Sequence, residues 1–503
     1  MVFATLSLMT HLFPTAKRQT LALIAVGLVI HIGFAGLLTL SVDEAHYALY
    51  ATLPSLSYFD HPPLVGWIQW PLVVINSPDW VLRLIPQALW LVATGLAWHL
   101  AETLRLTVPA WQAGSQAGEP GRWAVLMVLV GPVFHVLAVG LLPDTLLMAL
   151  TLGMMLTTLR LSQRPTLGRW LVLGLLLGLA GLSKYTAILA AIAVALMLWI
   201  NMSWRVLLTG SPWIAMALAL ALVSPVFIWN AANDWISFKY QLGHSSGGTW
   251  RAYRIGAFVG LQIVAFGPLA IMAAMTAGRF IWRHPQRHLI GLALFFLLPF
   301  LVTAYMSGGG RTLPHWMAPA WLVAIVLGAN PMAMRWQAGK RKLLAALAWI
   351  QAFMCVVAFL GLFFIGIPGV DHHHPLGKKN PLADLWGWDR AGQEVRQLAA
   401  AYQVDQLTVG NWTLASRLAW YARPLPVIVL DDRIDQFDIW YGQFQAGDKA
   451  LFLNWSQVPY TPPVGKDRFE QCNLLQTLPI ERLGRVVSEF EVFLCQNWQG
   501  KTP

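Results

Sequence analysis

Charged residues are scarce in this sequence: Asp, Glu, Lys and Arg together make up 11% of its 503 residues, against about a quarter in a typical soluble protein. Hydrophobic residues make up 57%, so the chain lacks the polar side chains that would cover a soluble surface. Only three cysteines are present, which excludes a disulfide-rich scaffold and a cysteine-rich metal centre. These shortages exclude a soluble cytosolic enzyme, a disordered protein and a nucleic-acid-binding protein, and they indicate a membrane protein.

Eleven apolar runs are long enough, or nearly long enough, to be membrane-spanning helices, which need about 20 mostly apolar residues. They cover residues 21–40, 81–101, 123–142, 145–159, 170–183, 185–200, 206–229, 255–277, 289–306, 315–332 and 343–367. The fourth and fifth runs are short. Lys17 and Arg18 precede the first run, and no small-x-small cleavage site follows it, so we expect a retained anchor rather than a cleaved signal peptide.

The basic residues predict the orientation of these helices. With the N-terminus inside, the inner loops hold fifteen Lys and Arg against two Glu, whereas the outer loops hold six basic and six acidic residues. The net charge of +11 therefore reflects the orientation of the chain in the membrane and does not indicate a surface that binds nucleic acid. An odd number of crossings places the residues after 367 on the outer side.

The C-terminal stretch 368–503 is much more polar and predicts a small α/β domain. Residues 405–410, 412–422 and 425–430 have the pattern of a strand, a helix and a strand, and 450–454 and 486–494 are also β-rich. Cys472 and Cys495 lie in this domain; in an oxidising periplasm they could form a disulfide, and two buried reduced thiols are the alternative. The tract 371–374, Asp-His-His-His, is interpreted as a solvated linker. We therefore divide the chain into a transmembrane domain 1–367, with large outer loops at 41–80 and 230–254, and an outer domain 368–503.

The candidate functional side chains of the first domain lie in the outer loops. They are Asp43, Glu44, Tyr58, Asp60, His61, Asp144, Lys184, His244, Arg251, Arg311 and Trp316. Ionisable groups beside hydrocarbon are costly and usually functional. Acids offer a base or metal ligands, cations bind phosphate, and a long apolar wall suits a lipid tail, so the pattern favours chemistry on a lipid-borne phosphate at the outer interface.

Five motifs, in order along the chain, carry a resemblance to a known family. They are Asp43-Glu44, the Tyr-Phe-Asp-His-Pro-Pro-Leu run at 58–64, Gly-Leu-Ser-Lys-Tyr at 181–185, and the segments 224–230 and 235–244. Over its first two-thirds the chain resembles the bacterial glycosyltransferase family 39 proteins. These are related to the protein O-mannosyltransferases and to the aminoarabinose transferase of lipid A.

The resemblance implies an all-α polytopic GT-C fold with about eleven transmembrane helices. It implies transfer of a sugar, with inversion, from an undecaprenyl phosphate donor to a periplasmic acceptor such as lipid A, lipopolysaccharide or another envelope glycan. We expect a monomer in the bacterial inner membrane, among membrane lipids, with its N-terminus cytoplasmic and its C-terminal domain periplasmic.

Asp43 is the predicted general base, because an acid within reach of the acceptor hydroxyl can take its proton. The alternative for Asp43 is an N-cap on a helix that starts at Glu44, and Glu44 could exchange roles with it. Asp60 and His244 match positions that bind metal in lipid A members of the family. They predict a divalent site for Zn²⁺ or Mn²⁺, or alternatively an Asp–His hydrogen bond that stabilises the loop.

Donor phosphate is assigned to Lys184, Arg251, Arg311 and His61. Lys184 could instead extend to the interface, and the arginines, Arg254 among them, could be interfacial anchors. His61 stands where the aminoarabinose transferases carry lysine, so it is expected to donate a hydrogen bond only.

Tyr58 and Trp316 are candidates for stacking on sugar or for interfacial anchors. Asp144 could orient Lys184 or bind a sugar hydroxyl, but helix capping after Pro143 is favoured.

Two other functions fit the composition. A lipid or sugar transporter (a flippase) would place binding groups near the bilayer midplane and between repeats, whereas here the polar motifs share one face and no repeat is apparent. A glycan polymerase or ligase would use the same site on larger donors.

Overall fold

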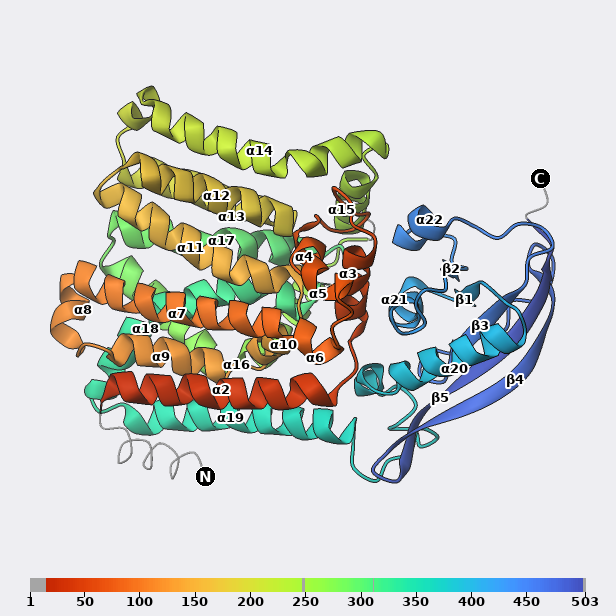
Figure 1. Ribbon diagram of the computed structural model, residues 1–503. Coiled ribbons are helices and arrows are strands. Elements are labelled where there is room, and N and C mark those ends of the chain that lie inside the picture. Colours follow the sequence, from red (N-terminus) through yellow and green to blue (C-terminus); the bar gives the residue numbers. More distant parts are fainter. Residues whose placement is uncertain (1–14, 247–248, 311, 501–503) are drawn as a thin grey trace. The chain divides into compact units, whose positions relative to one another are not determined.

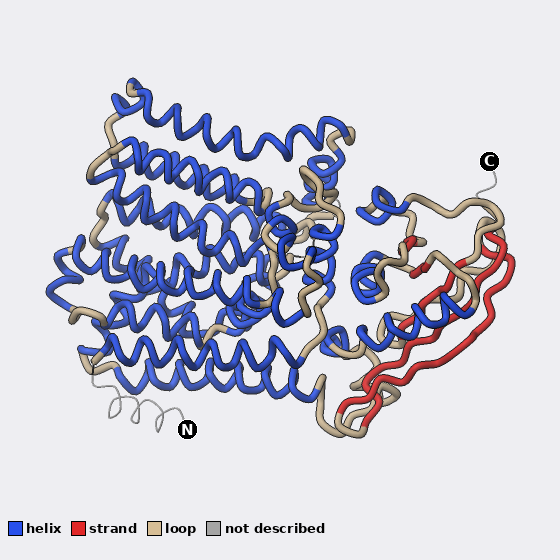
Figure 2. Tube along the Cα trace, viewed as in Figure 1, coloured by secondary structure: helices blue, strands red, loops and turns tan. Residues whose placement is uncertain are grey.

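The computed structural model describes residues 15–246, 249–310 and 312–500, without the side chains of residues 244–246. The chain forms two compact units. The first holds Ser55–Ile68 and Trp80–Val356 together with the chain before Gly36, and the second holds Gly36–Pro54, Gln69–Asp79 and the chain from Val357 onward. The first unit is helical, and the strands lie in the second (Figure 2).

The first unit is a bundle of long helices (Figure 1). Its helices, some of which end in the second unit, are α2 (Ala16–Leu37), α4 (Leu64–Trp67), α6 (Asp79–Leu82), α7 (Leu84–Thr107), α8 (Pro109–Gly114), α9 (Glu119–Leu129), α10 (Pro132–Val139), α11 (Pro143–Gln163), α12 (Leu167–Ser183), α13 (Ala187–Asn201), η1 (Trp204–Leu208), α14 (Gly210–Ala232), α15 (Ile236–Ser246), α16 (Tyr253–Arg283), α17 (Arg287–Ser307), η2 (Pro314–Met317), α18 (Ala318–Gln337) and α19 (Arg341–Phe364).

Every one of the eleven predicted apolar runs is helical, although not all are spans by length. Among the described residues, eight helices are long and apolar enough to cross a membrane, and the pair α9–α10, bent by 75°, makes a ninth when counted as one span. The fourth run, predicted to be short, belongs to the 21-residue helix α11. The last residues of α11 are polar, so the apolar run ends before the helix does. Polar residues are tolerated there because α11 lies largely inside the bundle, with 78% of its most apolar stretch buried. Helices α12 and α13 are shorter, at 17 and 15 residues.

Helix α18 forms the centre of the bundle. Its span is 94% buried, whereas that of α14 is 17% buried. Small residues let it pack closely, because a Cβ added at Gly328 would lie 2.5 Å from the Cβ of Ala273 on α16. The outer helices carry large exposed apolar side chains, such as Phe353 on α19, which suits a lipid-facing surface. The chain is thus a multi-pass membrane protein.

Helix α16 is broken in its middle, and a side chain from α19 fills the break. Gly267 has a φ of 81° and Pro268 follows it, so the regular backbone bonds are interrupted there. The side chain of Gln351 accepts a hydrogen bond from Leu269 N at 3.0 Å and donates one to Phe266 O at 2.8 Å. In an apolar surrounding these backbone groups need such partners.

The second unit is built around a five-stranded mixed sheet. Its elements are α3 (Val42–Thr52), α5 (Trp70–Val74), η3 (Pro381–Leu385), α20 (Trp388–Ala401), β1 (Leu407–Val409), α21 (Trp412–Tyr421), β2 (Val427–Val429), α22 (Gln436–Tyr441), β3 (Ala450–Trp455), β4 (Phe469–Arg482) and β5 (Arg485–Trp498). The strand order is β2-β1-β3-β5-β4. The pairs β1–β2 and β1–β3 are parallel, and β3–β5 and β4–β5 are antiparallel. The predicted strand–helix–strand unit and the strands at 450–454 and 486–494 are confirmed, but β4 was not predicted.

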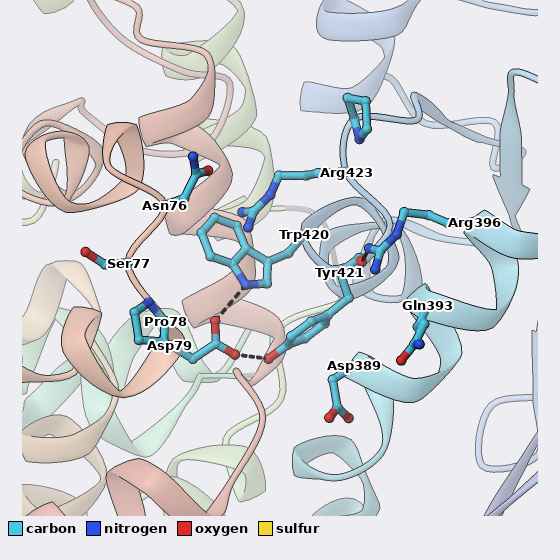
Figure 3. Close-up of a pocket in the computed structure, with 11 residues that line it drawn as sticks. Asn76, Ser77, Pro78, Asp79, Asp389, Gln393, Arg396, Trp420, Tyr421 and Arg423 are labelled. Atoms are coloured by element: carbon cyan, nitrogen blue, oxygen red, sulfur yellow. Dashed lines mark hydrogen bonds between the residues drawn. The ribbon is translucent and has the colours of Figure 1, made fainter.

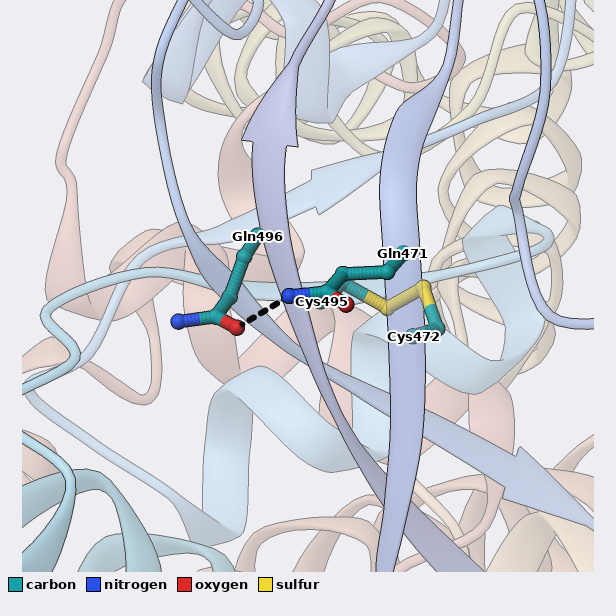
Figure 4. Close-up of a disulfide and its surroundings, with 4 residues drawn as sticks. All are labelled: Gln471, Cys472, Cys495 and Gln496. Carbon is teal, nitrogen blue, oxygen red and sulfur yellow. Dashed lines mark hydrogen bonds between the residues drawn. A yellow bond between two sulfur atoms is a disulfide. The ribbon is translucent and has the colours of Figure 1, made fainter.

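Cys472 and Cys495 form a disulfide (Figure 4). The two residues are direct partners in the register of β4 and β5, which brings their side chains together on one face of the hairpin. Of the two alternatives for these cysteines, the structure has the disulfide and not two reduced thiols. The third cysteine, Cys355, is buried in the bundle, where its thiol donates to Val130 O at 3.2 Å.

Candidate active site

Lys184 and Asp144 form a buried ion pair at the ends of two neighbouring helices of the bundle. Asp144 is the second residue of α11, and Lys184 follows the last residue of α12. The Lys184 Nζ lies 2.7 Å from each carboxylate oxygen of Asp144, and the two side chains are 8% and 2% exposed. The favoured interpretation of Asp144 as a helix cap is wrong, because its carboxylate pairs with Lys184. A lysine that is this buried also does not extend to the interface.

A short helix places two aromatic side chains beside this pair. The ring of Trp316 lies 5.5 Å from Lys184 Nζ, a cation–π contact. His315 Nε2 lies 3.8 Å from Asp144 Oδ2. Both residues come from η2, and His315 was not among the predicted site residues. Its only signal in the sequence is a titratable group directly before Trp316 in an outer loop.

The segment 58–63 forms a tight turn that carries Asp60 and His61. Tyr58 N donates to His61 O at 3.2 Å, and Tyr58 OH accepts from Ser55 N at 3.0 Å. The ring of Tyr58 is fully buried, so it holds the turn and presents no face for a sugar. Burial lowers the pKa of His61, although the carboxylate of Asp60 opposes this effect and the charge of Lys184 adds to it. Burial thus favours the neutral form of the His61 imidazole, which suits the predicted role of hydrogen-bond donor better than that of a cation.

Helix α15 is tied to this turn through its polar face. Ser237 Oγ donates to Tyr58 O at 3.0 Å and Gln241 Nε2 donates to Asp60 O at 2.8 Å. Position 244 follows on the same helical face, one turn after Gln241. The side chain of His244 lies outside the described part of the structure, so the metal pair of Asp60 and His244 stays a prediction. The helix that carries position 244 is nevertheless anchored to the backbone of Asp60.

The loop before α16 packs on the glycine cluster that follows α17. Arg251 N donates to Gly308 O at 2.8 Å, and Arg254 Nη1 donates to Gly309 O at 3.2 Å. A Cβ at Gly308 would lie 2.3 Å from Trp250 Nε1, so a larger residue there would displace the indole ring. The side chain of Arg251 is exposed, whereas Arg254 is used to hold the loop. Arg311 lies outside the described residues.

The two predicted acids of the first outer loop lie on α3, in the second unit. Ser41 is the N-cap, and Glu44 completes a capping box by accepting from Ser41 N at 3.0 Å and from Ser41 Oγ at 2.9 Å. The alternative in which Asp43 is the N-cap is therefore wrong. Within the described residues no hydrogen bond or ion pair engages the half-buried carboxylate of Asp43.

Contacts with the C-terminal part of the chain hold the start of α3. Asp384 Oδ2 accepts from Val42 N at 3.3 Å, and the other oxygen of Asp384 pairs with Arg417 of α21. The Arg417 guanidinium is 1% exposed and lies 4.0 Å from the ring centre of Trp388. One helical turn after Asp43, His46 Nδ1 is 3.0 Å from Ser416 Oγ. The helix that presents Asp43 thus packs on α21.

The tract at 371–374 is only partly a solvated linker. The ligand atoms of Asp371, His372 and His373 lie within 4.8 Å of one another. His373 and His374 are exposed, but His372 is buried, and its Nε2 lies 3.3 Å from Glu489 Oε2 on β5. The tract therefore fixes the start of the C-terminal stretch to the sheet.

Comparison with known proteins supports the resemblance found in the motifs. Residues 60–229 match the family model described as dolichyl-phosphate-mannose-protein mannosyltransferase. The lipid A galacturonosyltransferase RgtD of Rhizobium johnstonii is 23% identical over 308 residues, which span 60% of this chain and 62% of RgtD. The lipopolysaccharide core galacturonosyltransferase RgtA of the same organism is 23% identical over 355 residues, 65% of this chain and 67% of RgtA.

Solved structures decide the fold. ArnT from Cupriavidus metallidurans in the apo state superposes with a TM-score of 0.60 at 14% identity, covering 94% of this chain and 97% of ArnT. ArnT bound to undecaprenyl phosphate gives a TM-score of 0.60 at 15% identity, covering 95% and 98%. The chain has the GT-C fold of ArnT. The predicted fold class and the predicted resemblance to GT-C glycosyltransferases are confirmed.

Proposed function

We propose that this GT-C protein transfers a sugar from a polyisoprenyl phosphate to a hydroxyl group of a lipopolysaccharide glycan, on the outer face of a bacterial inner membrane. The observation that supports it best is the buried Lys184–Asp144 pair beside His61 and Trp316, at the ends of apolar helices. The activities named for RgtD and RgtA support the acceptor class. The undecaprenyl phosphate bound to ArnT supports the donor class.

Lys184 is the proposed ligand of the donor phosphate. An ammonium group has three N–H donors, and Asp144 accepts from Nζ with both of its oxygens. A phosphate oxygen would take a donor that Asp144 leaves available, while the carboxylate holds Nζ in place. As the bond between the sugar and the phosphate breaks, negative charge grows on the leaving phosphate, and a fixed cation stabilises it. Arg251 and Arg311 are proposed to add to this charge, and His61 to donate a hydrogen bond.

Asp43 is the proposed general base. The acceptor hydroxyl oxygen forms its bond to the anomeric carbon while the bond from that carbon to the phosphate oxygen breaks. The hydroxyl proton passes to the Asp43 carboxylate, and the polyisoprenyl phosphate leaves with the electron pair. Attack from the side opposite the phosphate inverts the anomeric configuration.

Asp60 and His244 are the residues that would hold a divalent cation, Zn²⁺ or Mn²⁺, which would supply further positive charge to the phosphate. Carboxylate and imidazole suit either ion. The anchoring of α15 to the backbone of Asp60 by Gln241 fits a role for this face of the helix in holding such a ligand.

A transfer assay tests the proposed function. The purified protein in nanodiscs is given an undecaprenyl phosphate sugar with a labelled sugar and a lipopolysaccharide acceptor. We expect label on the acceptor, with one undecaprenyl phosphate released per sugar transferred. Movement of the labelled lipid between leaflets of a liposome without a glycosylated product would identify a transporter and overturn the proposal.

A further inference from the structure

A groove of about 720 Å³ lies within the second unit, apart from the residues assigned above (Figure 3). The segment before α6 and the helices α20 and α21 supply its walls. Its lining residues are Asn76, Ser77, Pro78, Asp79, Asp389, Gln393, Arg396, Trp420, Tyr421, Arg423 and Pro424. We call it the arginine groove. Its volume falls in the range of pockets that hold small organic ligands.

The acid on one wall of the groove is already paired. Trp420 Nε1 donates to Asp79 Oδ1 at 3.0 Å, and Tyr421 OH donates to Asp79 Oδ2, as the dashed lines in Figure 3 show. Both carboxylate oxygens are therefore engaged, and the two aromatic side chains are held in fixed positions. This arrangement gives the groove a preformed floor.

The two arginines of the groove keep donors available. The guanidinium of Arg423 lies 3.3 Å from the ring centre of Trp420. Its Nη1 is buried and has no hydrogen-bond partner among the described residues. Arg396 is exposed, and its Nη1 donates to Tyr421 O, which leaves its other N–H groups open to a ligand. A buried donor needs an acceptor, which water or a ligand can supply.

We propose that the arginine groove binds an anionic saccharide, namely the phosphorylated or carboxylated part of the acceptor glycan. Guanidinium groups bind phosphate and carboxylate through paired N–H donors. The side-chain amides of Asn76 and Gln393 and the carboxylate of Asp389 suit sugar hydroxyls. The only apolar lining side chains without a polar atom are two prolines, so the groove does not suit the polyisoprenyl chain of the donor. This inference rests on the proposed function, because it names the acceptor of the same reaction.

Direct binding and kinetics together test the groove. The probes are three oligosaccharides of the same backbone: one phosphorylated, one with a uronic acid in place of the phosphate, and one neutral. Binding to the full-length protein is measured by calorimetry, and the Michaelis constants for donor and acceptor are measured in the transfer assay. The variants are Arg396→Ala and Arg423→Ala. Arg390→Ala is the matched control, since Arg390 is exposed on α20 and does not line the groove.

We expect the wild type to bind the two anionic oligosaccharides more tightly than the neutral one. The tighter of the two anionic ligands shows whether the groove prefers a phosphate or a carboxylate. Each groove variant should weaken anionic binding and raise the acceptor Michaelis constant about tenfold or more, while the donor constant and turnover at saturating acceptor match the control. Should Arg423→Ala fail to fold, Arg396→Ala gives the same test at an exposed position. Equal values for the groove variants and Arg390→Ala would overturn the inference.

The two proposals fail separately. If the wild type transfers no sugar, the proposed function fails, but the calorimetric preference for the anionic oligosaccharide is still measurable. If the wild type is active and shows no such preference, only the assignment of the groove fails.

Discussion

Lys184 and Asp144 put opposite charges where little water reaches them. Because the two residues are 40 positions apart along the chain, the sequence offered the pairing of Asp144 with Lys184 only as an alternative to helix capping. Each stands at the end of its own apolar run, and only the packing of α11 on α12 brings them together. Removing one partner of such a pair leaves an uncompensated buried charge, whereas replacing both with apolar groups is often tolerated.

Two variants can therefore separate the contribution of the pair to stability from the role of Lys184 in binding the donor phosphate. We expect Asp144→Leu to lower the free energy of unfolding by about 3–5 kcal/mol, and the double variant Lys184→Met with Asp144→Leu to recover much of that loss. Because the cation is gone, the double variant should still transfer no sugar. Thermal unfolding in detergent and the transfer assay measure the two effects. A stable double variant with wild-type turnover would contradict the phosphate role of Lys184.

The neighbouring acids of α3 should behave differently from each other. Asp43→Asn is expected to abolish transfer without changing the melting temperature, because its carboxylate has no structural partner among the described residues. Glu44→Gln should retain most turnover, since glutamine also serves in a capping box. Turnover by Asp43→Asn close to that of the wild type would remove Asp43 as the base.

Among the helices, the break in α16 shows what apolar periodicity does not reveal. Gly267 and Pro268 are visible in the sequence, but the side chain that satisfies the open backbone groups, Gln351, comes from a helix more than 80 residues away. Strand β4 was missed for a related reason. Its sequence is polar and includes Pro479, and most of its residues are not buried, so it carries no alternating pattern. Pairing with β5 alone makes it a strand.

Replacing Gln351 should destabilise the bundle. In Gln351→Leu the N–H of Leu269 and the carbonyl of Phe266 lose their partners in an apolar surrounding, and we expect a cost of about 2–5 kcal/mol. Phe353→Leu on the same helix is the control, because Phe353 is 65% exposed. Melting temperatures from fluorescence-detected gel filtration give the comparison. Equal values for the two variants would show that the break needs no partner.

Helix α22 should make the stability of the second unit depend on pH. Its N-cap, Asp435, accepts from Phe437 N at 2.7 Å, but its Oδ2 is buried without a partner among the described residues. Burial raises the pKa of Asp435 to about 6. The folded state therefore binds the proton more tightly than the unfolded state. The stabilisation from this group is complete below about pH 4 and is lost as the pH rises to about 6.

Asp435→Asn keeps the capping oxygen and removes the buried charge. We expect it to raise the free energy of unfolding by about 3 kcal/mol at pH 8 and to change it little at pH 4. The exposed Asp432→Asn is the control. Denaturant unfolding at the two pH values measures the difference, and a gain of equal size at both would contradict the assignment of the raised pKa to this carboxyl.

For the whole molecule, composition and the apolar runs predicted a multi-pass helical membrane protein, while the loop charges predicted an orientation that stays a prediction. The excess of Lys and Arg in one set of loops and the polar C-terminal stretch needed no tertiary information. The membership of α3 in the second unit was not predictable, because hydropathy follows the order of the chain and not its contacts. A disulfide joins Cys472 and Cys495 in that unit, which suits an oxidising compartment.

The orientation has a direct test. We expect a periplasmic reporter enzyme fused after Pro503 to be active, and the same reporter inserted in the basic loop between α11 and α12 to be inactive. Cys472 and Cys495 in membranes isolated under alkylating conditions should react with a maleimide only after reduction. An active reporter in the basic loop would reverse the predicted topology.

Three separate stretches of chain build the second unit, and this limits how the protein can be cut or recombined. A truncated chain that stops at residue 367 would keep α3 and lose α21, so that the face of α3 that packs on α21, His46 included, would lose its cover and favour aggregation. Exchanging the second unit between relatives would likewise require residues 36–54 and 69–79 to be transferred together with the C-terminal part. In protein engineering, the segments that contact one another in this unit must therefore be exchanged together, although they are not contiguous in the sequence.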